Sequence, residues 1–164
     1  LKTIPGRFQT FETSNNIMVI VDYAHTPDAL RNVLNTINKI RTQNENLITI
    51  VGCGGNRDKE KRPLMGSTAA RLSSKVIFTS DNPRDEEPDK IIQQMSEGVD
   101  PVDFKKTMCV SLRKEAIKIA CQMSNPGDIL LIAGKGHENY QEIKGERQPF
   151  DDYKIAIEIF SKIL

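Results

Sequence analysis

The sequence predicts an α/β domain of Rossmann-like type, in which a mostly parallel sheet is covered by helices on both faces. Short runs that are almost wholly apolar, such as 47–51 (LITIV) and 127–134 (GDILLIAG), alternate with longer segments of helical periodicity. Strands this apolar are typical of parallel sheets, because both faces of such sheets are buried. The unusual polar and glycine-bearing motifs follow the apolar runs, and ligands bind at that edge in folds of this class.

The first half of the chain predicts strand 17–23, helix 26–40, strand 47–51 and helix 61–73. The helix over 26–40 begins with Thr26 as its N-cap and Pro27 in its first turn. Its apolar residues recur on one stripe, which should face the sheet: Ala29, Leu30, Val33, Leu34, Ile37 and Ile40.

The second half predicts strand 75–80, helix 87–99, a short strand 107–110, helix 111–123, strand 127–134 and a closing amphipathic helix 151–164. A small hairpin is expected around Lys144 and Gly145. Neither a repeat nor a linker interrupts the pattern. The 164 residues therefore predict a single domain, long enough to bury a core of its own.

Composition excludes several classes of protein. The net charge of +1 gives no electrostatic case for nucleic-acid binding, and no apolar run approaches the ~20 residues of a membrane helix. The three cysteines, Cys53, Cys109 and Cys121, lack metal-ligand spacing, so we expect buried thiols in a reducing cytoplasm. The chain opens on LKTIPGRF, without Met or a signal peptide, and we expect a piece of a longer protein.

Four polar loops follow the predicted strands: DYAHTP after 17–23, GCGGNRDKEKR after 47–51, DNPR after 75–80 and GKGHENYQ after 127–134. Because the carboxyl ends of parallel strands share one edge of a sheet, these loops should meet there. The sequence therefore predicts a rim that holds a charged small molecule. It shows neither a nucleophile with a nearby base nor a metal-ligand cluster, so the residues alone do not give a reaction.

Each loop allows more than one interpretation. In the glycine loop, Arg57 stands where a dinucleotide-binding fingerprint needs glycine, so that fingerprint is not met. The Arg57 guanidinium could donate hydrogen bonds to a carboxylate or phosphate, or it could be a solvated charge in a turn. Gly136 stands where a Walker A loop needs Ser or Thr. Asp22 could accept hydrogen bonds from ribose hydroxyls or serve only in a turn.

The stretch TSDNPRDEEP (79–88) is either an Asn-Pro turn or a loop that recognises a molecule with both a carboxylate and an ammonium group. Asp85, Glu86 and Glu87 are expected to be the solvated start of the next helix.

Read together, six motifs resemble the C-terminal domain of the Mur ligases: PGRF, VDYAHTPDAL, GCGGNRDKEKRPLMG, TSDNPR, IAGKGHENYQ and PFDD. The resemblance covers essentially all of 1–164, and is greatest to members that add the third residue of the peptidoglycan stem peptide. It implies ATP-dependent amide formation through an acyl phosphate, on UDP-MurNAc-L-Ala-D-Glu, in the bacterial cytoplasm. It also implies that Mg²⁺ and the Walker A loop belong to a central domain and the UDP site to an N-terminal domain, so this piece should be inactive alone.

The resemblance further assigns residues to two binding tasks. The nucleotide would be approached by Arg7, Asp22, Tyr23 and His25. The incoming meso-diaminopimelate would be held by Arg57, Asp81, Asn82, Arg84, Gly134 and Glu138. Arg84 of DNPR would clamp the distal carboxylate that lysine lacks, with Asn82 and Asp81 orienting the same end; Arg57 would take a carboxylate, and Gly134 and Glu138 an ammonium group. The alternatives are a non-catalytic nucleotide- or amino-acid-binding module, or a Mur ligase for L-lysine or a diaminopimelate analogue.

Overall fold

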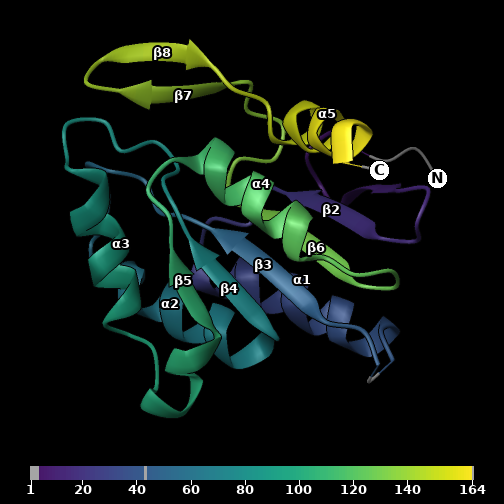
Figure 1. Ribbon diagram of the computed structural model, residues 1–164. Coiled ribbons are helices and arrows are strands. Elements are labelled where there is room, and N and C mark those ends of the chain that lie inside the picture. The colour runs from purple at the N-terminus through teal and green to yellow at the C-terminus, as the bar shows by residue number, and fades with distance from the viewer. Residues whose placement is uncertain (1–3, 43, 164) are drawn as a thin grey trace.

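The computed structural model describes residues 4–42 and 44–163, which form a six-stranded sheet with helices on both faces (Figure 1). Across the sheet the strands are β1 (Gln9–Glu12), β2 (Met18–Asp22), β6 (Ile129–Ala133), β3 (Leu47–Val51), β4 (Lys75–Phe78) and β5 (Thr107–Cys109). The five strands β2 to β5 in this order run parallel, and only β1 pairs antiparallel, with β2. The predicted α/β class and mostly parallel sheet are confirmed.

The helices divide between the two faces of the sheet. One face carries α1 (Pro27–Ile40), α2 (Lys61–Leu72) and α3 (Pro88–Ser96), and the other carries α4 (Arg113–Met123) and α5 (Asp152–Ile163). Figure 1 shows these two helical layers with the sheet between them. Among the described residues, no helix is long and apolar enough to cross a membrane.

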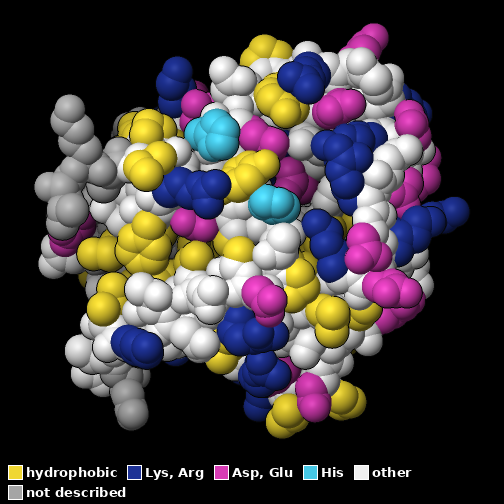
Figure 2. Space-filling model, turned by 180° about the vertical axis from the view of Figure 1, so that it is seen from behind, with side chains coloured by type: hydrophobic (Ala, Val, Ile, Leu, Met, Phe, Trp, Pro, Cys, Tyr) yellow, Lys and Arg dark blue, Asp and Glu magenta, His cyan; other side chains and the backbone are white. Residues whose placement is uncertain are grey.

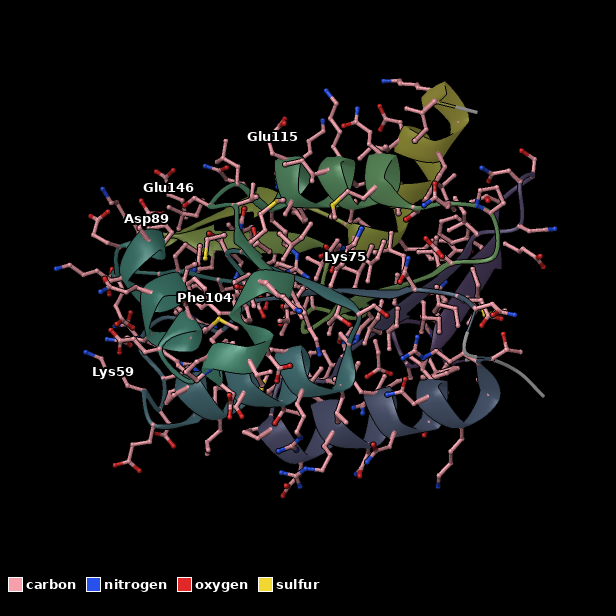
Figure 3. All side chains as sticks on the ribbon, turned by 60° about the horizontal axis from the view of Figure 1, so that its bottom comes forward. Lys59, Lys75, Asp89, Phe104, Glu115 and Glu146 are labelled. Carbon is pink, nitrogen blue, oxygen red and sulfur yellow. The ribbon has the colours of Figure 1, made fainter. Side chains whose placement is uncertain are left out.

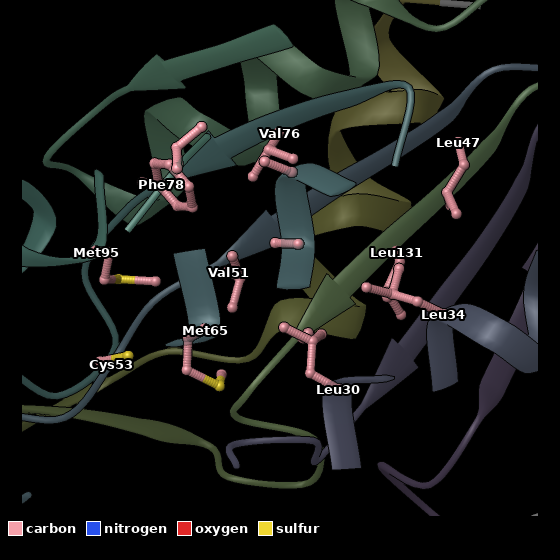
Figure 4. Packing of buried hydrophobic residues seen from close by; sticks show 14 of the residues in the cluster. Leu30, Leu34, Leu47, Val51, Cys53, Met65, Val76, Phe78, Met95 and Leu131 are labelled. Carbon is pink, nitrogen blue, oxygen red and sulfur yellow. The ribbon is translucent and has the colours of Figure 1, made fainter. Parts of the chain in front are cut away.

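Each face of the sheet has its own hydrophobic core, since successive residues of a strand point to opposite faces. Ile20 packs with Leu30 and Leu34 of α1 on one face, and its neighbour Val19 packs with Phe160 of α5 on the other. Figure 4 shows the first of these cores, where Leu131 of β6 lies near Leu34. Charged side chains such as Lys59, Asp89 and Glu115 lie on the outside of the molecule (Figure 3).

Helix α1 begins as predicted. The Thr26 side chain accepts a hydrogen bond from the Ala29 N–H, and Pro27 stands at the first helical position, where its missing N–H costs nothing. The apolar stripe, however, ends earlier than predicted. Ile40, the last residue of the helix, is 61% exposed, and the buried stripe consists of Leu30, Leu34 and Ile37.

The hairpin predicted around Lys144 and Gly145 is present as β7 (Tyr140–Ile143) and β8 (Glu146–Pro149). Both turn residues have positive φ, 48° for Lys144 and 79° for Gly145, which suits the twist of a two-residue hairpin turn. This hairpin stands apart from the main sheet, above the ends toward which the arrows of β3 and β4 point (Figure 1).

Three features differ from the prediction or were missed by it. Strand β1 and the 3₁₀ helix Pro101–Lys106 were not predicted, because neither buries an apolar run: β1 alternates between half-buried and exposed residues, and the 3₁₀ helix has no buried residue. Cys53 and Cys121 are buried as expected, but Cys109 is exposed, because β5 is the short edge strand of the sheet.

Candidate functional site: a charged cavity at the carboxyl edge of the sheet

The four loops that follow β2, β3, β4 and β6 meet at one edge and enclose a cavity of about 790 Å³, with hairpin β7–β8 as a further wall. The four loops therefore meet at one edge of the sheet, as predicted. Eight of the ten residues singled out in the sequence line the cavity: Tyr23, His25, Arg57, Asp81, Asn82, Arg84, Gly134 and Glu138. The other two, Arg7 and Asp22, are not among the lining residues.

The glycine loop after β3 packs directly on the DNPR loop after β4. The Gly55 N–H donates a hydrogen bond to the Asn82 carbonyl over 2.8 Å. A Cβ atom on Gly55 would lie 1.9 Å from the Pro83 carbonyl oxygen, which no side chain can tolerate. Glycine at this position therefore permits the contact that brings Arg57 and Arg84 to the same cavity.

Arg84 is held in a left-handed backbone conformation, with φ of 50°. Its N–H donates to the Glu142 carbonyl over 3.0 Å, and its own carbonyl accepts from the Lys144 N–H over 2.9 Å, so the loop is joined to the hairpin. This conformation costs a non-glycine residue of order 1 kcal/mol, which the surrounding contacts must offset. It aims the guanidinium into the cavity, where Nη1 donates to the Gly55 carbonyl over 2.9 Å.

Lys135 is the centre of the acidic side of the cavity, and it was not assigned a role from the sequence. It is fully buried, and its Nζ donates to Asn82 Oδ1 over 2.7 Å and to the Tyr140 carbonyl over 2.8 Å. Asp81 Oδ1 and Glu138 Oε1 lie 3.3 and 3.4 Å from the same nitrogen. One buried cation therefore neutralises part of the charge of two carboxylates and joins the loop after β6 to the loop after β4 and to the start of β7.

The Asn82 amide is engaged within the protein. Besides Lys135, its Oδ1 accepts from the Glu142 N–H over 2.9 Å, and its Nδ2 donates to Glu138 Oε1 over 3.3 Å. Gly134 has φ of 115°, and a Cβ there would lie 2.9 Å from Asp81 Oδ2. The structure thus brings Asp81, Asn82, Gly134 and Glu138 into one corner of the cavity. The Asn82 side chain connects Lys135, Glu138 and Glu142 there by hydrogen bonds.

A buried ion pair holds the backbone where the loops after β4 and β6 begin. Arg113, at the start of α4, donates through Nη1 to the Ser80 carbonyl and through Nη2 to the Ala133 carbonyl, over 3.1 and 3.2 Å. These carbonyls directly precede Asp81 and Gly134. Burial alone would lower the pKa of Arg113, but the fully buried Asp152 carboxylate outweighs it and the pKa is raised. Arg113 therefore stays charged and holds the backbone just after β4 and at the end of β6.

Glu86 is a structural anchor rather than the solvated helix start that was expected. It accepts from the fully buried Arg62 over 2.7 Å and from the Asn56 N–H over 2.6 Å. The hydrogen bond from Arg62 lowers the pKa of Glu86 to about 2, although partial burial opposes the shift. Through these two hydrogen bonds, Glu86 ties α2 and the glycine loop to the residues before α3. The expectation failed because no sequence pattern shows that Arg62 is buried.

A second cluster lies beside the cavity and is aromatic. The ring centroid of Tyr23 lies 4.5 Å from that of His25 and 5.3 Å from that of His137. The guanidinium carbon of Arg7 lies 5.2 Å above the Tyr23 ring. Figure 2 shows both histidines of the chain on this one face. The cluster offers aromatic faces, imidazoles and a guanidinium to a ligand.

The carboxylate of the buried Asp22 holds the backbone that carries this aromatic cluster. Asp22 is 8% exposed, and its two carboxylate oxygens accept from the backbone N–H groups of Phe8 and Ala24, each over 2.8 Å. It thereby holds the turn that carries Arg7 against the end of β2. Its oxygens face these backbone donors, and it lies outside the cavity lining.

The buried Cys53 lies in the glycine loop and does not line the cavity. Burial raises the pKa of the Cys53 thiol to about 12, so this thiol stays protonated and serves as a small apolar side chain. Among residues 4–42 and 44–163, no group of three His, Cys, Asp or Glu side chains is placed to hold a metal ion.

Comparison with known proteins identifies the family to which this chain belongs. The family model described as "Mur ligase, glutamate ligase domain" matches residues 6–136. The chain is 53% identical over 161 residues to the UDP-N-acetylmuramoyl-L-alanyl-D-glutamate–2,6-diaminopimelate ligase of Bacteroides thetaiotaomicron, covering 98% of this chain and 33% of that protein. It is 55% identical over 158 residues to the ligase of the same name from Cytophaga hutchinsonii, covering 96% and 32%. The chain spans about a third of the length of the curated relatives it matches.

A solved structure of a UDP-N-acetylmuramoyl-L-alanyl-D-glutamate–2,6-diaminopimelate ligase superimposes with a TM-score of 0.88 and 43% identity, covering 99% of this chain and 32% of that one. The UDP-N-acetylmuramate-alanine ligase of Thermotoga maritima has the same fold at 21% identity, with a TM-score of 0.63. The family model matches more than half of the chain, so the chain belongs to the Mur ligase family, of which it carries the glutamate ligase domain.

Proposed function

We propose that this chain is the amino-acid-binding domain of an ATP-dependent ligase that adds meso-diaminopimelate to UDP-MurNAc-L-Ala-D-Glu in peptidoglycan synthesis. Relatives more than 50% identical carry the name of this ligase, which supports the assignment. The observation that carries the proposal is the Arg84 guanidinium, aimed into the cavity by a left-handed backbone and a docked hairpin. A fixed guanidinium is suited to a carboxylate, and the distal carboxylate distinguishes diaminopimelate from lysine.

The charges of the cavity match a molecule with ammonium and carboxylate groups at both ends. Arg57 and Arg84 supply guanidinium groups to the cavity, and Asp81 and Glu138 supply carboxylates. In the proposed complex, Arg84 binds the distal carboxylate and Arg57 the other carboxylate. Gly134, through its carbonyl, and Glu138 accept from an ammonium group. Asp81 and Asn82 keep this corner in place through Lys135.

The aromatic cluster is proposed to approach ATP. Tyr23 and His25 line the same cavity, and Arg7 stacks on Tyr23 with its guanidinium available for phosphate oxygens. Asp22 would hold these residues in place from behind. A ligase of the same fold, MurF from Thermotoga maritima, was solved in complex with ADP, at 18% identity and a TM-score of 0.61.

The reaction would be completed by further domains of a longer protein. We propose that a central domain binds Mg²⁺ and most of ATP and that an N-terminal domain binds UDP, so that residues 1–164 alone are inactive. The muropeptide carboxylate would take the γ-phosphoryl group from ATP, with ADP as leaving group. The amine of diaminopimelate, positioned by this domain, would then attack the acyl carbon and release phosphate.

The test is the mass of the product that the full-length protein forms from UDP-MurNAc-L-Ala-D-Glu, ATP and Mg²⁺ with each candidate amino acid. The proposal predicts a product with meso-diaminopimelate and little with L-lysine. A protein that ligates lysine as well as diaminopimelate would contradict the assigned specificity. A protein that forms no product with any amino acid, yet binds nucleotide or amino acid, would instead be a binding module.

A further inference from the structure

The cavity contains a carboxylate that was not among the residues singled out in the sequence. Glu142 Oε2 lies 3.5 Å from Nε of Arg84, and the two side chains are 26% and 18% exposed. Both residues line the cavity. The arginine proposed to bind a ligand carboxylate is therefore already paired with a carboxylate of its own protein.

We propose that Glu142 is an internal substitute for the distal carboxylate of diaminopimelate and sets the affinity and selectivity of the site. This inference rests on the proposed function. In the free protein, Glu142 neutralises Arg84; when the amino acid enters, its carboxylate takes this place and the Glu142 side chain turns away. No bond is made or broken, and only one side chain moves.

The Glu142 side chain can turn away without releasing the hairpin, because the main chain of Glu142 makes the docking contacts. Its N–H donates to Asn82 Oδ1 over 2.9 Å, and its carbonyl accepts from the Arg84 N–H over 3.0 Å. Gln141 adds a hydrogen bond from Nε2 to the Asp81 carbonyl over 2.8 Å. A change confined to the carboxylate of Glu142 therefore leaves this wall of the cavity in place.

A second cation is available to the displaced carboxylate. Arg147 lies directly opposite Glu142 in the β7–β8 ladder, and such opposed pairs have Cβ atoms ~5 Å apart on the same face. Its guanidinium stacks 4.1 Å above the Tyr140 ring and also lines the cavity. Over residues 4–42 and 44–163, neither a side-chain hydrogen bond nor an ion pair engages this guanidinium. Arg147 is therefore the cross-strand neighbour of Glu142, and its guanidinium lines the same cavity.

The competition has opposite consequences for the two candidate amino acids. Diaminopimelate must displace Glu142, and a partly exposed pair of this kind weakens its binding by about two- to fivefold. Lysine has no distal carboxylate, so Arg84 can keep Glu142 as its partner when lysine enters. The pair therefore reduces the penalty on lysine, and this chain's selectivity is lower than Arg84 alone would give.

The test is Glu142→Gln in the full-length protein, with Glu146→Gln as the matched control. Glu146 lies on the same hairpin but outside the cavity lining, at the periphery of the molecule (Figure 3). For Glu142→Gln we expect the KM for meso-diaminopimelate to fall about two- to fivefold, with kcat and the KM for ATP unchanged and lysine use not improved. Glu146→Gln should change none of these values.

A second variant separates the exchange from a simple loss of charge. Arg147→Gln should raise the KM for diaminopimelate in the wild-type background, and should raise it less in the Glu142→Gln background, because the displaced carboxylate is then absent. An unchanged or raised KM for diaminopimelate in Glu142→Gln, or an equal gain for lysine, would overturn the inference. If the wild-type protein does not ligate diaminopimelate at all, the proposed function itself fails, and this inference with it.

Discussion

Arg113 and Asp152 form a fully buried, two-pronged ion pair, with 2.9 Å between Nε and Oδ1 and 2.7 Å between Nη2 and Oδ2. The same guanidinium holds the carbonyls of Ser80 and Ala133, the last residues before the acidic corner of the cavity. The pair thus connects the N-termini of α4 and α5 to the carboxyl ends of β4 and β6, two strands that lie on either side of β3. Stability and the position of the binding loops depend on the same contacts.

Breaking this pair from one side should be strongly destabilising. Asp152→Asn leaves the Arg113 charge buried without its carboxylate, and we expect the free energy of unfolding to fall by about 3–5 kcal/mol. Urea unfolding of the domain, followed by circular dichroism, measures the change. Asp151→Asn, at the neighbouring half-buried position, is the control and should cost far less. Equal losses for the two variants would contradict the central role of the pair.

The buried Lys135 should be needed both for folding and for binding. Lys135→Met keeps the length and apolar stem of the side chain but leaves Asp81 and Glu138 without their shared cation. We expect a loss of about 3 kcal/mol in unfolding free energy. In the full-length protein, we also expect the KM for the amino acid to be higher in Lys135→Met than in the wild type. A variant with unchanged stability and unchanged KM would show that the acidic corner does not depend on this lysine.

Glu86 makes stability depend on pH in the acid range. Its pKa is lowered to about 2 in the folded protein from an ordinary value of 4.5, so its contribution is complete above pH 4.5 and is lost as the pH falls toward 2. Glu86→Gln should therefore be less stable than wild type at pH 7, and the difference should shrink between pH 4.5 and 2.

Unfolding curves at a series of pH values measure the Glu86 contribution. Glu87→Gln, at the exposed neighbouring position, serves as the control and should follow the wild-type curve closely. A gap between Glu86→Gln and wild type that stays constant down to pH 2 would show that the ion pair with Arg62 is not what stabilises the loop.

The sequence predicted the parts of the fold that follow from hydrophobic pattern and turn chemistry. Strand β3 is buried throughout and apolar except for Thr49, Thr26 and Pro27 mark the start of α1, and the turn at Lys144 and Gly145 marks the hairpin. The meeting of the four loops at one edge followed from parallel pairing alone. The charged residues of these loops indicated a small charged ligand, and the family resemblance assigned the individual residues to it.

The buried charges could not be predicted in the same way. A lysine or arginine in a polar loop usually lies in solvent, and Lys135 is buried only because acceptors from distant loops surround it. Glu142 depends on the docking of the hairpin against Arg84, which no local pattern encodes. Such contacts join residues far apart in the chain, so their partners become visible only in the folded structure.

The most direct test of the central claim is the ratio of kcat/KM for meso-diaminopimelate to that for L-lysine in the full-length protein, with and without Arg84→Ala. If Arg84 reads the distal carboxylate, the variant loses the charged hydrogen bonds that only diaminopimelate makes, so the ratio falls by about 10- to 100-fold while the KM for ATP stays near the wild-type value. A ratio that is unchanged in Arg84→Ala, or a wild-type ratio near one, would contradict the account.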